Sequence, residues 1–363
     1  MNVETRFSLY PIGRLAQIVP RGMDDDNFDL ALLPFEVGPA VHIEDVSPII
    51  REGDLEIHKP GIGEYRFREL QRIKYAIIHR YPQHGHDADT GEYLVDADQT
   101  AKSRKLVLEL AACLRIIRPV TVHADLCEGR VADNRELYHI NFNEPTPGFS
   151  LPTCQRHFAI RKEDLEDLRL YAPMFKAAMA GPFWKFRMAV QMYDTGYFQS
   201  DHWKIRFFLW TSALEALFTS QTTSEHRGSR VARERIKAHL GAGSDVYPPG
   251  ELTRLEQNPA LTVADVVDEV YCLRNHIAHG DKIPNYYYGQ TGRQTLNGKL
   301  NRIEMLIENI SFLVRRSLLK IMKDGLLAHF QDSPSSESYF DAQQLTRTAI
   351  ERRFGRSSYR CPS

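Results

Sequence analysis

Between about residues 155 and 330, the apolar residues of this 363-residue chain recur every three or four positions. That spacing places them on one face of a helix, and no alternating strand pattern interrupts it. Amphipathic helices without strands between them bury their apolar faces against one another. We therefore expect an all-α bundle over 155–330, with helices at 162–179, 183–193, 203–219, 229–240, 263–279 and 299–323.

The first half of the chain has a different pattern. Three short apolar segments, 6–13, 28–37 and 40–46, are bounded by Pro, Gly or Asp clusters, which indicates strands. The stretch 99–118 has helical periodicity and stops at a proline. Residues 1–150 are therefore predicted to form a mixed α+β domain, so that the fold class is multidomain α+β.

Two further segments mark expected boundaries. Residues 143–153 hold three Pro and a Gly among small polar residues, which is typical of a linker. Residues 331–363 are Ser-rich and then Arg-rich, and we expect a loosely attached C-terminal tail.

Charge and cysteine usage exclude several classes of protein. The chain has 46 Lys and Arg against 47 Asp and Glu, so a uniformly basic coat for nucleic acid is excluded. Five cysteines without a CxxC spacing favour reduced thiols in the cytoplasm. The N-terminus lacks a signal-peptide pattern, and the most apolar window, 205–218, is too short to span a bilayer. We expect a cytoplasmic protein that has no membrane partner.

The most informative motif is YCLRNHIAHG, at 271–280. It places Arg274, Asn275 and His279 in the last turns of a predicted helix that begins after Thr262 and ends at a glycine. Arginine keeps its charge and offers a planar set of donors to phosphate oxygens. An imidazole can give or take a proton near neutral pH, and Asn275 shares a helical face with His279.

This motif resembles the hallmark of the HEPN superfamily, in which an Arg, usually followed by a polar residue, precedes a His by a few residues. The resemblance extends upstream, because three segments follow the order seen in the ApeA-like branch of HEPN domains: TSALEALF at 211–218, RVARERI at 230–236 and then the motif itself. The resemblance implies a metal-independent endoribonuclease that needs no cofactor and leaves 2′,3′-cyclic phosphate ends. It also implies a toxic role in anti-phage defence, with RNA such as tRNA as the target.

The geometry of one helix does not bring the two charged residues together. Five residues correspond to a rotation of roughly 140°, so Arg274 and His279 do not share a face. The resemblance implies a homodimer, in which two copies of the motif face each other and form one composite site. An isologous two-fold interface brings each residue opposite its counterpart.

Other residues could assist such a site. Arg230, Arg233 and Lys237 lie in a short basic stretch that could contact an RNA backbone, or form a solvated helix face. Tyr286 and Tyr287 follow the motif in a loop and could stack on bases, or pack against the bundle.

Glu215 lies in an otherwise apolar helix and needs a partner, for which Arg274 is the obvious candidate. Such a pair would position the guanidinium, or serve the structure alone.

Two alternative functions remain open at this point. The domain could be a catalytically inactive HEPN module that binds a protein or nucleic acid, because fold does not determine function. A metal-dependent hydrolase could use a metal ion bound by His84 and His86 with Asp87 or Asp89, which are residue types that bind metals. A solvated loop is the favoured interpretation of this segment.

Overall fold

The computed structural model describes the backbone of residues 3–12, 33–48, 60, 64, 75–84, 97–118, 127–132, 135–140, 162–198, 202–246, 261–295 and 298–354. The chain divides into two compact units. The first comprises Met1–Phe149 and Arg156–Phe175, and the second comprises Ser150–Gln155 and Lys176–Ser363. The predicted linker at 143–153 lies outside the described residues. An N-terminal α+β unit followed by a helical unit agrees with the predicted fold class.

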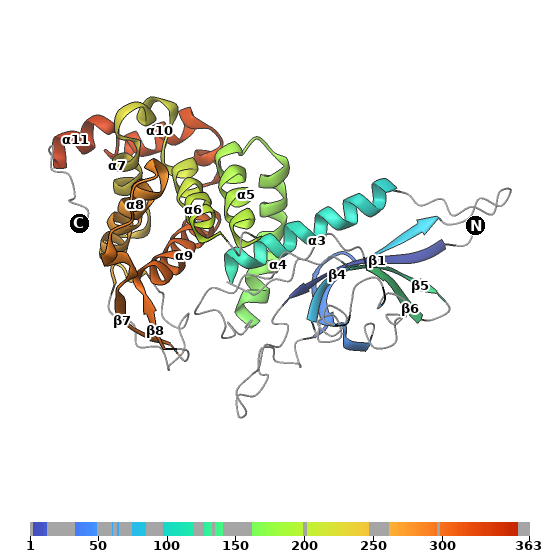
Figure 1. The fold of residues 1–363 in the computed structure, drawn as a ribbon. Coiled ribbons are helices and arrows are strands. Elements are labelled where there is room, and N and C mark those ends of the chain that lie inside the picture. Colours follow the sequence, from blue (N-terminus) through green and yellow to red (C-terminus); the bar gives the residue numbers. More distant parts are fainter. Residues whose placement is uncertain are drawn as a thin grey trace. The chain divides into compact units, whose positions relative to one another are not determined.

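The first unit is built on one antiparallel sheet (Figure 1). Its strand order is β2-β3-β4-β1-β5-β6, so β1 lies between β4 and β5. Ser8 of β1 pairs with His79 of β4; Ser8 is fully buried and His79 is half-buried. The strands are β1 (Val3–Ile12), β2 (Phe35–Gly38), β3 (Val41–Asp45), β4 (Tyr75–His84), β5 (Cys127–Ala132) and β6 (Arg135–Ile140).

Helix α3 (Ala97–Ile117) packs across β1 and β4 (Figure 1). Ser103 donates a hydrogen bond to Ser8 at 2.8 Å and lies 2.8 Å from Nδ1 of His79. Arg115 donates to the hydroxyl of Tyr10 at 3.2 Å. Several buried polar groups of this interface therefore find partners across it, which favours a stable core.

The second unit is mainly helical, and α6 is its central helix. α6 contacts α5, α7, α8 and α9, which explains why its sequence is the most apolar of the chain. The helices are α4 (Lys162–Ala180), which spans the boundary between the units, α5 (Trp184–Phe198), α6 (Trp203–Phe218), α7 (Gln221–Leu240), α8 (Val263–His279), α9 (Arg302–Lys323), α10 (Ser333–Ala342) and α11 (Arg347–Phe354), with 3-10 turns η3 (Asn285–Tyr288) and η4 (Leu327–Phe330).

A small hairpin interrupts the helices of the second unit, where the sequence predicted no strand. β7 (Gln290–Thr295) pairs with β8 (Gly298–Asn301). Asn301 then caps α9 by accepting from the backbone of Glu304, whose side chain accepts from the Asn301 backbone in return. This capping box starts the helix at residue 302 rather than 299, because it satisfies the first free amide groups.

The expectation of a loosely attached tail is wrong for residues 331–354. They form α10 and α11, and Arg235 of α7 contacts α10 and Leu345, which lies between the two helices. Arg235 is fully buried and makes two hydrogen bonds to the Glu337 carboxylate, at 2.7 and 2.8 Å. It also donates to the carbonyl oxygens of Phe218 and Leu345. A short, polar segment gives no sequence signal of such a contact, since the partner lies 102 residues away.

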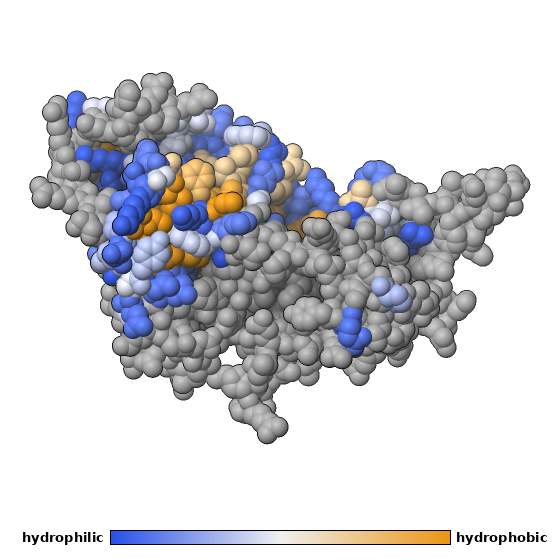
Figure 2. Space-filling model, viewed as in Figure 1, coloured by the Kyte–Doolittle hydropathy of each residue, from blue (hydrophilic) through white to orange (hydrophobic). Residues whose placement is uncertain are grey.

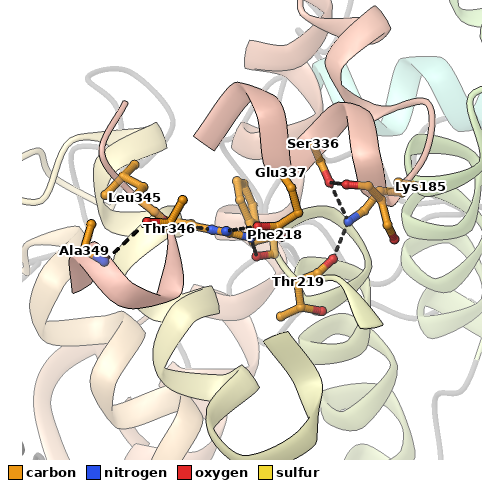
Figure 3. Close-up of polar contacts among 10 residues, drawn as sticks. Lys185, Phe218, Thr219, Ser336, Glu337, Leu345, Thr346 and Ala349 are labelled. Atoms are coloured by element: carbon orange, nitrogen blue, oxygen red, sulfur yellow. Dashed lines mark hydrogen bonds and ion pairs between the residues drawn. The ribbon is translucent and has the colours of Figure 1, made fainter. Parts of the chain in front are cut away.

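Lys185 of α5 adds a second buried cation to this contact. Its amine donates to the carbonyl oxygen of Thr219, at the end of α6, and to the hydroxyl of Ser336 on α10 (Figure 3). Burial, with the nearby charge of Arg235, lowers the pKa of Lys185 to about 8. We call Lys185, Arg235, Ser336 and Glu337 the C-terminal latch.

Cysteine chemistry differs from the prediction at one position. Cys272, on the buried face of α8, is disulfide-bonded, whereas reduced thiols were expected throughout. Cys113 of α3 is a free and fully buried thiol, and its burial raises its pKa far above the usual range. No described helix has the length and apolar character needed to cross a bilayer.

We predict that a buried histidine makes the second unit sensitive to acid. Burial lowers the pKa of His239 from 6.5 to about 4, while Nε2 donates to the Ser317 carbonyl oxygen. The unfolded chain therefore takes up a proton at a higher pH than the folded one. The free energy of unfolding should fall by about 3 kcal/mol as the pH drops from 6.5 to about 4.

Urea unfolding across this pH range tests the prediction. His239→Phe keeps an aromatic ring beside Phe218 and Phe330 and removes the titrating group. The variant should lose most of the pH dependence in this window. An equally steep dependence in the variant would assign it to other groups.

Candidate functional site

The motif at 271–280 forms the last turns of α8, as predicted. Thr262 caps the first turn in a capping box with Asp265, and the helix buries an apolar face that includes Val266 and Val270. Gly280 ends the helix in the left-handed conformation, at φ 69°, where a glycine is favoured. The chain therefore turns sharply directly after His279.

Arg274 is fixed by an ion pair with Glu215 of α6. Its Nη2 donates to Oε2 of Glu215 at 3.0 Å, which confirms the predicted pairing of the two residues. The two side chains are 21% and 22% exposed, so the guanidinium is oriented by the protein and still reaches solvent. Cζ of Arg274 also lies 5.7 Å from the ring centroid of Phe208, an α6 residue that sequence reasoning missed. The sequence signal was only the position of an aromatic residue seven residues, or two helical turns, before Glu215.

The surroundings of this pair are low in polarity. Burial raises the pKa of Glu215, although the charge and hydrogen bond of Arg274 act in the opposite direction. Tyr271 is buried beside them, and burial and the charge of Glu215 raise its pKa well above the usual range. Its hydroxyl finds no hydrogen-bond partner among the described residues. Charge interactions are stronger here than at an open surface, because water is partly excluded.

Asn275 and His279 lie on a different side of the same helix end. Asn275 is half-buried, and His279 is exposed. The backbone stays helical from Arg274 to His279. The two side chains are therefore separated by a rotation of roughly 140° within the protomer. The structure thus places all three residues on one helix end without giving Arg274 and His279 a common face.

The turn η3, which holds Tyr286 and Tyr287, contacts the same end of α8. Tyr287 is completely buried, and its ring meets the ring of His276, another residue of the last turn, at 6.2 Å. Tyr286 is 37% exposed and packs edge-on against Tyr287, with Cζ of Arg302 4.1 Å from its centroid. Of the two tyrosines predicted to contact RNA, only Tyr286 therefore offers ring surface to a ligand, and the neighbouring Tyr288 is more exposed still.

The basic stretch on α7 is largely neutralised by an acid from α8. Arg233 and Lys237 both bind Asp268, at 3.1 and 2.9 Å, and Lys237 also lies 3.2 Å from Glu234. Arg230 is half-buried. The sequence showed a cluster of positive charge, but it did not show that α8 would place a carboxylate between two of these cations.

The alternative metal site cannot be placed. His84 ends β4, and residues 85–96 lie outside the described part of the chain. Among the residues that the structure describes, no group of three or more His, Cys, Asp or Glu is arranged to hold a metal ion.

No protein-family model matches this chain, and no curated protein or solved structure matches it either. The expectation of an HEPN domain, drawn from the motif at 271–280 and the sequence segments before it, therefore stays a prediction. The function has to be inferred from the site itself.

Proposed function

We propose that the protein is a metal-independent endoribonuclease whose catalytic residues are Arg274, Asn275 and His279. The observation that carries this proposal is the end of α8, where Glu215 orients a solvent-reaching guanidinium and an exposed imidazole follows one turn later. Metal-independent cleavage of an RNA phosphodiester requires a cation for the phosphate, a group that takes the 2′-OH proton and a group that protonates the leaving oxygen.

In the proposed reaction, an imidazole takes the proton of the ribose 2′-OH. The 2′-oxygen attacks the adjacent phosphorus, and the bond from phosphorus to the 5′-oxygen breaks. Arg274 stabilises the charge that develops on the phosphate oxygens, and a protonated imidazole gives a proton to the leaving oxygen. The products carry a 2′,3′-cyclic phosphate and a 5′-hydroxyl, and no cofactor is consumed.

The active form in this proposal is a homodimer. Two imidazoles are needed when one takes a proton and the other gives one, and each protomer supplies one His279. A two-fold axis near the end of α8 would place Arg274 of one protomer against His279 of its partner, which removes the problem of the 140° rotation.

Other residues have supporting parts in this proposal. Tyr286 would contact unpaired bases, and Arg230, Arg233 and Lys237 would contact the RNA backbone after exchanging their internal acidic partner for phosphate. Tyr287 would support the ring of Tyr286 rather than touch RNA.

The biological setting follows from the same resemblance. The N-terminal unit would hold the substrate or sense a trigger, and the cytoplasmic role would be anti-phage defence through cleavage of RNA such as tRNA.

A second candidate is a catalytically inactive HEPN module that binds a protein or nucleic acid. The ion pairs that occupy Arg274, Arg233 and Lys237 favour it, because such pairs also occur in purely structural settings.

Cleavage in the presence of EDTA separates these functions. The purified full-length protein should cut single-stranded RNA at the same rate with and without the chelator, and should leave DNA of the same sequence intact, because DNA lacks the 2′-OH. Loss of cleavage in EDTA, restored by a divalent metal, would assign the activity to a metal site. RNA binding without any cleavage would favour the inactive module.

A further inference from the structure

Phe208 is an exposed aromatic residue on α6. The helix buries Phe207, Trp210 and Leu214 in the centre of the bundle, yet Phe208 remains 40% exposed and Ile205, one turn earlier, is also exposed. Figure 2 shows hydrophobic side chains gathered on this face of the helical unit, over α6 and α8. Burying a phenylalanine ring is favourable, so this exposed ring beside a cation can serve as a contact surface for a ligand.

The ring of Phe208 lies directly beside the proposed phosphate-binding group. Glu215 is seven residues further along α6 and therefore on the same helical face. Its ion pair brings the Arg274 guanidinium to 5.7 Å from the centroid of the Phe208 ring. An aromatic surface and a cation are thus held next to each other by one ion pair between two helices.

We propose that Phe208 stacks on an unpaired base of the RNA whose phosphate is bound by Arg274. A nucleotide carries a flat aromatic base and an anionic phosphate, which match the ring and the cation. A base within a duplex is stacked on both faces, whereas an unpaired base can offer a face to an aromatic side chain. The substrate class is therefore RNA that is single-stranded or looped at the cleavage site. This inference rests on the proposed function and adds to it.

The exposed part of Phe208 and the guanidinium beside it suit a nucleotide. At 40% exposure, Phe208 offers roughly 80 Å² of the about 200 Å² that such a side chain can bury. The Arg274 guanidinium beside the ring is paired with Glu215 and still reaches solvent, so it can also meet a phosphate.

The test is binding of a short single-stranded 2′-O-methyl RNA, measured by fluorescence anisotropy with the full-length protein. The blocked 2′-oxygen prevents cleavage, so binding is measured separately from catalysis. Phe208→Leu keeps an apolar side chain and removes the aromatic face, and it should weaken binding about 5- to 150-fold. Phe208→Trp should bind at least as tightly as the native protein.

A matched control is available in the same unit. Trp184 is also exposed and lies beside an arginine, with Cζ of Arg187 at 5.2 Å from its ring. Trp184→Leu should leave binding unchanged. Unchanged binding by Phe208→Leu would overturn the inference. A shift in the oligomeric state of this variant in sedimentation velocity would also overturn it, because it would show that the ring contacts a second copy of the protein.

The two proposals fail in different ways. If native protein binds the blocked strand through Phe208 but does not cut ordinary RNA, the nuclease proposal fails and base stacking stands. If RNA is cut and Phe208→Leu binds the blocked strand as native protein does, base stacking fails and the nuclease stands. A duplex of the same sequence should bind equally well to the native protein and to Phe208→Leu. A loss of duplex affinity in Phe208→Leu would contradict base stacking.

Discussion

Replacing His279 with alanine should lower the rate of RNA cleavage by about 10²- to 10⁴-fold, the usual contribution of a positioned proton-transfer group. The imidazole is exposed at the end of α8, and its loss removes no buried contact of the bundle. Folding and oligomeric state should therefore be unchanged. The measurement is a single-turnover cleavage assay on a labelled RNA, accompanied by urea unfolding and sedimentation velocity.

His202→Ala provides the matched control for this prediction. His202 is also exposed and precedes α6 without making a side-chain capping hydrogen bond. Its replacement should leave the rate unchanged. If His279→Ala cleaves within about twofold of the native rate, less than any general acid–base contribution, His279 has no catalytic role. Equal losses in both variants would point to a non-specific effect of removing histidine.

Replacing Glu337 with alanine should lower the free energy of unfolding of the helical unit by about 3 kcal/mol. The change would leave Arg235 fully buried with its charge uncompensated, because the guanidinium makes both of its carboxylate hydrogen bonds to this residue. Burial opposes ionisation of Glu337, but the hydrogen bonds and charge of Arg235 outweigh it and lower the pKa of the carboxyl. Urea unfolding near neutral pH gives the value.

The control for Glu337→Ala is a variant that removes an ion pair at the surface. Lys320 and Asp324 are separated by 2.6 Å but are 42% and 44% exposed. Asp324→Ala should therefore change stability by less than about 1 kcal/mol. Glu337→Gln, which keeps the shape and part of the hydrogen bonding, should lie between the two. A Glu337→Ala protein as stable as Asp324→Ala would mean that Arg235 finds other compensation.

The helix that carries the site could be predicted from sequence because its signals are local. Thr262 and Gly280 mark its two ends, and the apolar residues between them follow one face. The pairing of Glu215 with Arg274 was also predictable, since a carboxylate in an apolar helix needs a cation.

Features that depend on distant contacts could not be predicted in this way. Asp268 neutralises two cations of α7 only because α7 and α8 pack together. Tyr287 and Tyr286 are neighbours in sequence, yet one is buried and the other is partly exposed. The docking of α10 depends on Arg235, and nothing in the composition of residues 331–354 indicates that partner. In each case tertiary packing, rather than local pattern, decides the outcome.

The central claim is that Arg274 and His279 act on a phosphodiester through the neighbouring ribose hydroxyl. The most direct measurement uses an RNA in which the mapped cleavage position carries a single 2′-deoxy substitution, with the product ends analysed by mass spectrometry. We predict cyclic phosphate ends on the unmodified RNA and no cut at the deoxy position. Cleavage at that position, or linear 3′-phosphate or 3′-hydroxyl ends formed from the start of the reaction, would contradict the claim.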